Sequence, residues 1–217
     1  MENKKNTILL TVIAVATLLV AVVGATFAYF TAQGGTGSAA NVTVSTGTAG
    51  SSSLGTFTAI SIYADANSFA QGKGNATGTS TGTVAWTAPG LAEGASSDDL
   101  TEADRSFCYT ASLAVTKNDF VYSSTNTDHN AELTLTAKKN DVVVLQDKDI
   151  TVGTASVSIP TEKDGSTMTH KLVANAGATK SDKWELTVTL VNLGVDQNDN
   201  TSKQFTGAVK FDKTNCQ

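Results

Sequence analysis

Residues 107–115 read Phe-Cys-Tyr-Thr-Ala-Ser-Leu-Ala-Val, and this stretch decides the fold class. Phe107 and Tyr109 begin a set in which every second side chain is apolar. Because successive side chains of a β-strand point to opposite faces, the alternation predicts a strand with one face in a core. Cys108 falls on the other face, so we expect it on the outer side of the sheet or near an edge.

The same period of two recurs on both sides of this strand, most clearly in residues 184–190 and 204–212. Further strands are predicted over residues 41–46, 54–63, 83–87, 120–122, 131–137, 142–145, 155–159 and 167–174. Residues 138–141 read as the turn of a hairpin. Residues 67–82 are rich in Gly, Ser, Thr and Asn and are predicted to form a loop, and residues 91–103 a polar connection.

About nine to eleven short strands with regular turn signals predict an all-β protein. No long helical period follows residue 30 and no internal repeat is visible. We therefore expect a β-sandwich over residues 41–217, with a closed barrel as the second choice.

The start of the chain has the parts of a secretory signal. Lys4 and Lys5 precede an uncharged apolar run over residues 7–30. Small residues before Tyr29 favour cleavage between Ala28 and Tyr29, which makes residues 1–28 a signal peptide and residues 29–40 a flexible leader. The alternative is a retained membrane helix, because roughly 20 apolar residues are enough to span a bilayer.

Composition limits the partners. The formal net charge of the 217 residues is −5, and a chain without residues 1–28 would carry about −6. Nucleic acids and anionic lipid surfaces attract basic proteins. We therefore expect no nucleic-acid partner, and contact with a membrane only through the N-terminal segment.

The two cysteines, Cys108 and Cys216, allow one intramolecular pairing. Exported chains with an even number of cysteines usually form disulfides. A bridge here would fasten the middle of the domain to its last residue but one. The alternative is two unrelated thiols.

No residue pattern predicts catalysis or a bound cofactor. His129 and His170 lie in polar surroundings, outside any metal-binding spacing, and are interpreted as surface histidines. Residues 196–200 read Asp-Gln-Asn-Asp-Asn and offer oxygen ligands for Ca²⁺, but they lack the glycine and the final glutamate of an EF-hand. A plain loop is favoured there, so no catalytic, metal or cofactor residue is predicted.

One family shares several of these features. The lysine-rich start, the long apolar run and the ending Gly-Ala-Thr-Phe-Ala-Tyr-Phe-Thr at residues 24–31 resemble Gram-positive exported proteins cut by the SipW-type signal peptidase. That group includes TasA, a biofilm matrix fibre protein, and camelysin. The body is similar in strand order, and residues 183–207 look like a segment of other proteins with this signal.

The resemblance implies a jelly-roll domain, export to the cell surface or beyond, and contact with a signal peptidase. It also implies a homopolymer in which the mature N-terminal segment completes the sheet of the next subunit. The matching positions here are Asn41, Val42, Thr43 and Val44. Camelysin is described as a metallopeptidase, but the ligand pair that this activity needs is not recognisable here.

Three alternatives stay open at this point. The apolar run could be kept, giving a membrane-tethered or pilin-like surface protein or adhesin. A divergent camelysin-type peptidase is less favoured. Residues 41–46 could also pair within their own domain, leaving a monomer.

Overall fold

The computed structural model describes residues 48–216 apart from residues 71, 93, 97, 98 and 154. Thr48–Gln217 forms one compact unit. The expectations for the signal, for cleavage between Ala28 and Tyr29, for the leader and for the strand at residues 41–46 lie outside the described residues.

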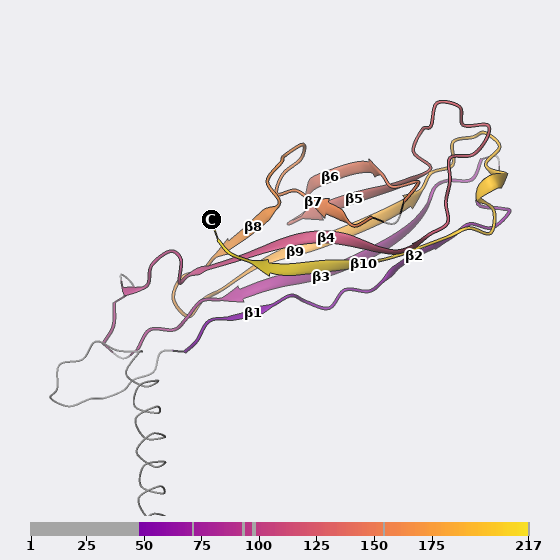
Figure 1. The fold of residues 1–217 in the computed structure, drawn as a ribbon. Helices are drawn as coiled ribbons and strands as arrows, with labels where there is room; N and C mark the ends of the chain where they lie inside the picture. The colour runs from indigo at the N-terminus through magenta and orange to yellow at the C-terminus, as the bar shows by residue number, and fades with distance from the viewer. Residues whose placement is uncertain (1–47, 71, 93, 97–98, 154, 217) are drawn as a thin grey trace, which may run out of the picture. The chain divides into compact units, whose positions relative to one another are not determined.

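Ten strands of the described chain form two antiparallel sheets that pack face to face (Figure 1). Sheet A has the order β1 (Ser51–Ser53), β3 (Ala76–Thr87), β9 (Thr179–Leu190), β5 (Leu133–Lys139) and β6 (Val142–Asp149). Sheet B has the order β2 (Ile60–Tyr63), β10 (Gln204–Thr214), β4 (Ser106–Asn118) and β7 (Val157–Ile159), and β8 (Thr169–Val173) pairs with β4 beside β7. One turn of 3-10 helix, η2 (Asn198–Asn200), precedes β10.

The order of the strands in the two sheets identifies the topology of the sandwich. If β7 and β8 are taken as one broken strand, sheet B has the order β2-β10-β4-β7/β8 and sheet A has the order β3-β9-β5-β6, with β1 added outside β3. This is the strand order of a jelly roll, a double-sheet solution for eight antiparallel strands. The predicted all-β, jelly-roll-like sandwich is confirmed.

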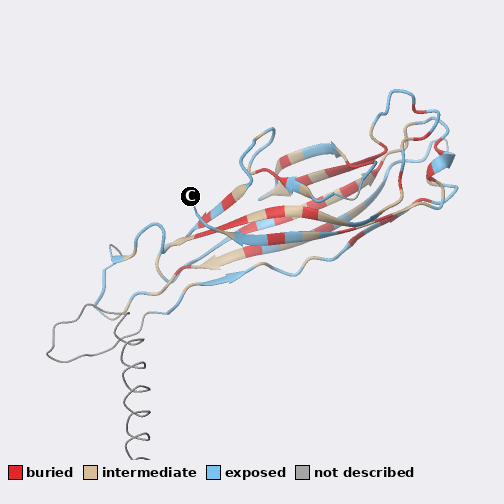
Figure 2. Ribbon diagram, in the orientation of Figure 1, coloured by how far each residue is buried: buried red, intermediate tan, exposed pale blue. Residues whose placement is uncertain are grey.

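The core lies between the sheets, and buried positions recur at every second residue along strands such as β2, β8 and β9 (Figure 2). Phe107, Tyr109 and Leu113 of β4 are buried on the face predicted from sequence. They face β9, where Trp184 and Leu186 are fully buried. The hairpin at residues 138–141 is also confirmed, since β5 and β6 pair across Asn140 and Asp141, both of which have positive φ.

The predicted loop at residues 67–82 was wrong in its second half. β3 begins at Ala76 and pairs along its whole length with β9. Threonines at alternate positions suit a strand because they are β-branched. Gly82 is tolerated because the ring of Phe57 lies where its side chain would be, with three ring atoms 2.5–2.7 Å from the position of a Cβ.

Two smaller expectations also need correction. Residues 120–122 are not a strand: Asn118 accepts from the amide of Phe120, and Asn200 bonds the amide and the carbonyl of Val121. In residues 54–63 only Ile60–Tyr63 is a strand, because residues 54–59 cross from sheet A to sheet B.

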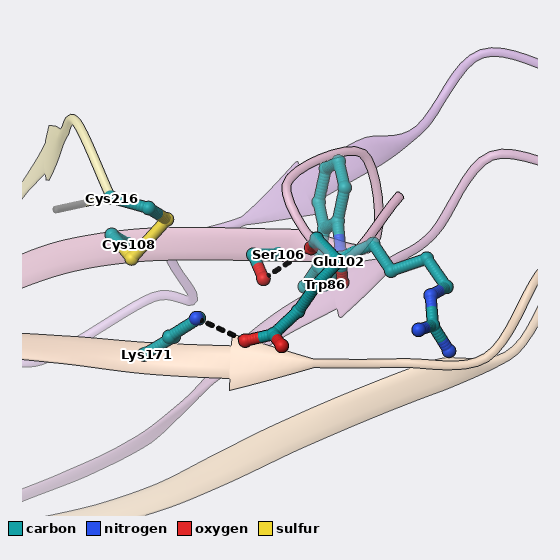
Figure 3. The surroundings of a disulfide bond; sticks show 7 residues. Trp86, Glu102, Ser106, Cys108, Lys171 and Cys216 are labelled. Atoms are coloured by element: carbon teal, nitrogen blue, oxygen red, sulfur yellow. Dashed lines mark hydrogen bonds and ion pairs between the residues drawn. A yellow bond between two sulfur atoms is a disulfide. The ribbon is translucent and has the colours of Figure 1, made fainter. Parts of the chain in front are cut away.

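The predicted disulfide is confirmed: Cys108 bonds Cys216, with Cα atoms 5.2 Å apart (Figure 3). Cys108 lies on the outer face of β4, as expected, but β4 is flanked by β10 and β8 and is not an edge strand. Thr214 at the end of β10 pairs with Cys108, which brings Cys216 over it. The bridge therefore fastens the final strand to the centre of sheet B.

We predict that loss of the bridge lowers the free energy of unfolding by about 2–4 kcal/mol, because the bridge closes a loop of 108 residues. Urea denaturation with and without reductant measures the difference. Cys216→Ser is the matched control, because reductant should not shift its midpoint. An unchanged midpoint for the reduced native chain would contradict the prediction.

Candidate functional site

One edge of sheet A, strand β3, has a long stretch of backbone without a strand partner among the described residues. Strand β3 has β9 on one side over all twelve residues. On its other side β1 pairs only with Ala85, Trp86 and Thr87. Residues 76–84 therefore have no strand partner on that side among the described residues.

Two contacts show which backbone groups point outward from β3. Ala88, just beyond the strand, donates its amide toward Ala178 and so toward the β9 side. The carbonyl oxygen of Thr83 points the other way, 2.4 Å from where a Cβ of Gly55 would lie. Since orientation alternates along a strand, the outward N–H and C=O groups belong to Thr77, Thr79, Thr81 and Thr83.

This edge lacks the charge, proline and bulges that usually protect a long edge, although Gly55 of the crossing segment lies against the carbonyl oxygen of Thr83. Residues 76–84 read Ala-Thr-Gly-Thr-Ser-Thr-Gly-Thr-Val, without charge or proline. Their pairing with β9 is regular, with no bulge. Natural sheets ordinarily protect a long flat edge with charge, proline, bulges or a covering loop. Residues 77–81 of β3 therefore lack a strand partner, charge, proline and a bulge on this side.

The opposite edge of sheet A shows the contrast. The pairing of β6 with β5 has two register shifts. Asp147 has a φ of 46°, and Lys148 and Asp149 add charge. Lys163 also reaches over from the loop after β7 to bond Gln146 at 2.8 Å.

The edges of sheet B are short or charged. β2 has four residues, β7 three and β8 five. β2 covers only the first four residues of β10, and the rest of that side of β10 carries Lys210, Asp212 and Lys213. Among the described strands, β3 alone has a long, regular and uncharged open stretch.

The hydrophobic core beside this edge is nevertheless closed. Residues 54–59 cross between the sheets, and Phe57 packs on Phe211 of β10 with ring centroids 4.8 Å apart. Leu54 and Phe57 are partly buried against the core. What remains open at β3 is backbone, and not an apolar cavity.

At one end of the sandwich, a buried carboxylate ties two loops together. Glu132 is fully buried and accepts hydrogen bonds from Ser123, Asn126, Gln197 and Asn200 at 2.6–2.9 Å. Burial alone would raise its pKa, but these donors outweigh burial and hold the pKa of Glu132 below its ordinary value. The loops around residues 121–126 and 196–200 are therefore fixed to the end of β5.

In the loop considered for calcium, residues 196–200, the side-chain oxygens of the two aspartates accept hydrogen bonds from backbone amides of the protein. Asp196 accepts from the amide of Asn198, and Asp199 accepts from the amide of Ser124 at 2.7 Å. Gln197 and Asn200 point to Glu132. Within the described residues no group of three or more His, Cys, Asp or Glu side chains could hold a metal ion.

The interpretation of His170 as a surface residue was wrong, whereas His129 is exposed as expected. His170 is fully buried, stacks on Tyr109 at 5.2 Å and meets the edge of Trp184 at 4.9 Å. Its Nε2 lies 3.2 Å from the carbonyl oxygen of Ile159. Burial lowers the pKa of His170 to about 4, which makes the neutral ring part of the core.

A buried polar pair completes this cluster. Tyr109 donates to Asp182 at 2.6 Å and accepts from Trp184 Nε1 at 3.0 Å, and Asn140 donates to Asp182 at 2.7 Å. Burial and the bond to Asp182 raise the pKa of Tyr109. The cluster joins β4 of sheet B to β9 of sheet A, and its polar atoms form hydrogen bonds with one another inside the core.

Comparison of the chain with protein-family models, curated proteins and solved structures found no match. Among the described residues, no helix is both long enough and apolar enough to cross a membrane.

We predict that stability falls by about 1.5 kcal/mol between pH 6.5 and pH 5, because only unfolded chains protonate His170 in that range. A pKa lowered in the folded state means that the unfolded chain binds more protons as the pH falls. Lys139, 3.5 Å away, and Asp182 are the charged groups that face the ring.

Urea denaturation at a series of pH values measures this loss of stability. His170→Phe should remove the dependence in this window, and His129→Asn should keep it. Equal pH dependence in the native chain and the His170→Phe variant would contradict the prediction.

Proposed function

We propose that the chain is a secreted structural protein whose copies assemble into extracellular fibres or a biofilm matrix. Each copy would donate its mature N-terminal segment, with residues 41–44 at its centre, as a strand to the next. The observation that carries the proposal is the stretch over residues 76–84 of β3, which has no strand partner on one side and carries neither charge nor proline. Strand addition to such an edge is a general mode of protein recognition.

Three further features support export and a structural role. Residues 1–28 have the charge and apolar pattern of a secretory signal. The Cys108–Cys216 bridge suits an oxidising compartment. The buried histidine and carboxylates take part in packing and loop fixation. TasA, which the N-terminal residues resemble, is a fibre protein of this kind.

The alternative hypotheses predict different N-termini, activities and assembly states for the extracellular protein. A membrane-tethered or pilin-like protein would keep the apolar run over residues 7–30. A camelysin-type peptidase would cleave protein substrates in a manner sensitive to chelators. A monomer would keep residues 41–46 within its own domain.

Negative-stain imaging of the secreted protein, with N-terminal sequencing of the same sample, tests the proposal. We expect fibres whose subunits begin at Tyr29. Deletion of residues 29–46, which removes the whole donor segment, should leave a folded protein, with an unchanged urea midpoint, that no longer forms fibres. Fibres that persist after the deletion would refute strand donation, and subunits that begin near Met1 would favour the membrane-tethered alternative.

A further inference from the structure

We propose that the Ser123 hydroxyl and the Asn200 carboxamide react within the folded chain to form an ester bond, with release of ammonia and with Glu132 as the group that moves the proton. This self-modification goes beyond the proposed function, because it takes place inside one copy and needs no assembly. The contacts of the buried site around Glu132, at the end of the sandwich that holds η2, carry the inference.

The site brings a nucleophile to a base. The Ser123 hydroxyl donates to Glu132 Oε2 at 2.8 Å, and a general base takes a proton over such a distance. The pKa of Glu132 is held below its ordinary value by its hydrogen-bond donors, so the carboxylate is ionised at neutral pH and can accept the proton. A hydroxyl beside such a base is an activated nucleophile.

The same carboxylate oxygen contacts the group that leaves. Asn200 Nδ2 donates to Glu132 Oε2 at 2.7 Å and lies 3.3 Å from Ser123 Oγ. Asn126 and Gln197 also donate to Glu132, but it is the Asn200 carboxamide that contacts the hydroxyl. The nucleophile, the proton carrier and the leaving nitrogen therefore meet at one place.

The carbonyl end of the Asn200 side chain is held as an acyl transfer requires. The amide of Val121 donates to Asn200 Oδ1 at 2.9 Å, and a donor at that distance stabilises the negative charge that develops on this oxygen. The Val121 carbonyl accepts from Nδ2 at 2.7 Å, so both ends of the carboxamide are fixed. Ser123, Glu132 and Asn200 are buried, which keeps water from competing with the hydroxyl.

The reaction is balanced without a further reactant. Ser123 Oγ attacks Cγ of Asn200, and its proton passes to Glu132. The Cγ–Nδ2 bond then breaks, and Glu132 gives the proton to Nδ2, which leaves as ammonia. One ester forms, one primary amide is lost, and Glu132 returns to its original state. Protonation and dilution of the ammonia at neutral pH oppose the reverse reaction.

The place of the bond in the fold explains what it would do. Ser123 follows β4 and Asn200 precedes β10, and these two strands pair at the centre of sheet B. The Cys108–Cys216 bridge joins the same two strands at the other end of their pairing. Figure 1 shows η2 and the C-terminal end of β10 at opposite ends of that strand. The ester would therefore close β4 and β10 into one covalent ring.

Peptide mapping of the secreted full chain by mass spectrometry, after reduction and digestion with trypsin, tests the proposal. Cleavage after lysine places Ser123 in the peptide of residues 118–138 and Asn200 in that of residues 184–203. We expect the two peptides to be joined, with a mass lower than their sum by one ammonia molecule. Hydroxylamine, which cleaves esters and leaves ordinary amides intact, should separate them.

Two matched variants assign the nucleophile. Ser123→Ala should give the two peptides separately, and Ser124→Ala, which removes the neighbouring hydroxyl of an exposed residue, should still give the joined form. A native-like near-ultraviolet circular dichroism spectrum ensures that the Ser123→Ala result reports chemistry and not misfolding. Joined peptides in Ser123→Ala would overturn the role of Ser123.

The native chain provides the decisive result by itself. Separate peptides of unaltered mass would overturn the ester. Conversion of Asn200 to aspartate without a link would also overturn it, because water and not Ser123 would then have attacked the carboxamide. Each of these results leaves the proposed function untouched, since fibre formation is measured separately on the same material.

Discussion

A strand at the edge of a sheet leaves the N–H and C=O groups of one side without a strand partner, and in sheet A the long uncharged stretch of this kind among the described strands is residues 76–84 of β3. Four threonines there present their backbone groups outward, while β9 fully pairs the other side. The cause is the path of the chain, because residues 54–59 cross from sheet A to sheet B and lead into β2. On the way Phe57 packs on Phe211 at the side of the core. Closing the core thus leaves the edge open.

Three interactions hold the rest of the fold together. Cys108–Cys216 fastens β10 to β4 in one sheet, and the Tyr109–Asp182 bond joins the two sheets across the core. At the end of the sandwich that holds η2, the Glu132 carboxylate fixes two loops by accepting hydrogen bonds from uncharged donors. An edge that is already ordered loses little conformational entropy when a strand binds to it, so less of the binding free energy is lost to ordering.

Alternation of apolar and polar residues was enough to predict the fold class, the inward face of β4 and the β5–β6 hairpin. It failed at the first half of β3, because Gly78 and Gly82 look like loop residues when their partners, Ile60 and Phe57, are unknown. The alternate threonines of that stretch were the signal that could have found the strand. His170 and Glu132 were missed for a related reason: their burial depends on residues far away in sequence. The cysteine pairing was predictable because two cysteines permit only one bridge.

The most direct test of this account is hydrogen–deuterium exchange of the β3 amides in dilute protein and in assembled material. The account predicts fast exchange at Thr77, Thr79, Thr81 and Thr83 in the dilute state, slow exchange at the intervening residues, and protection of all of them after assembly. Equal protection of the four threonine amides in dilute and assembled protein would contradict it, because the edge would then already be paired within the single chain.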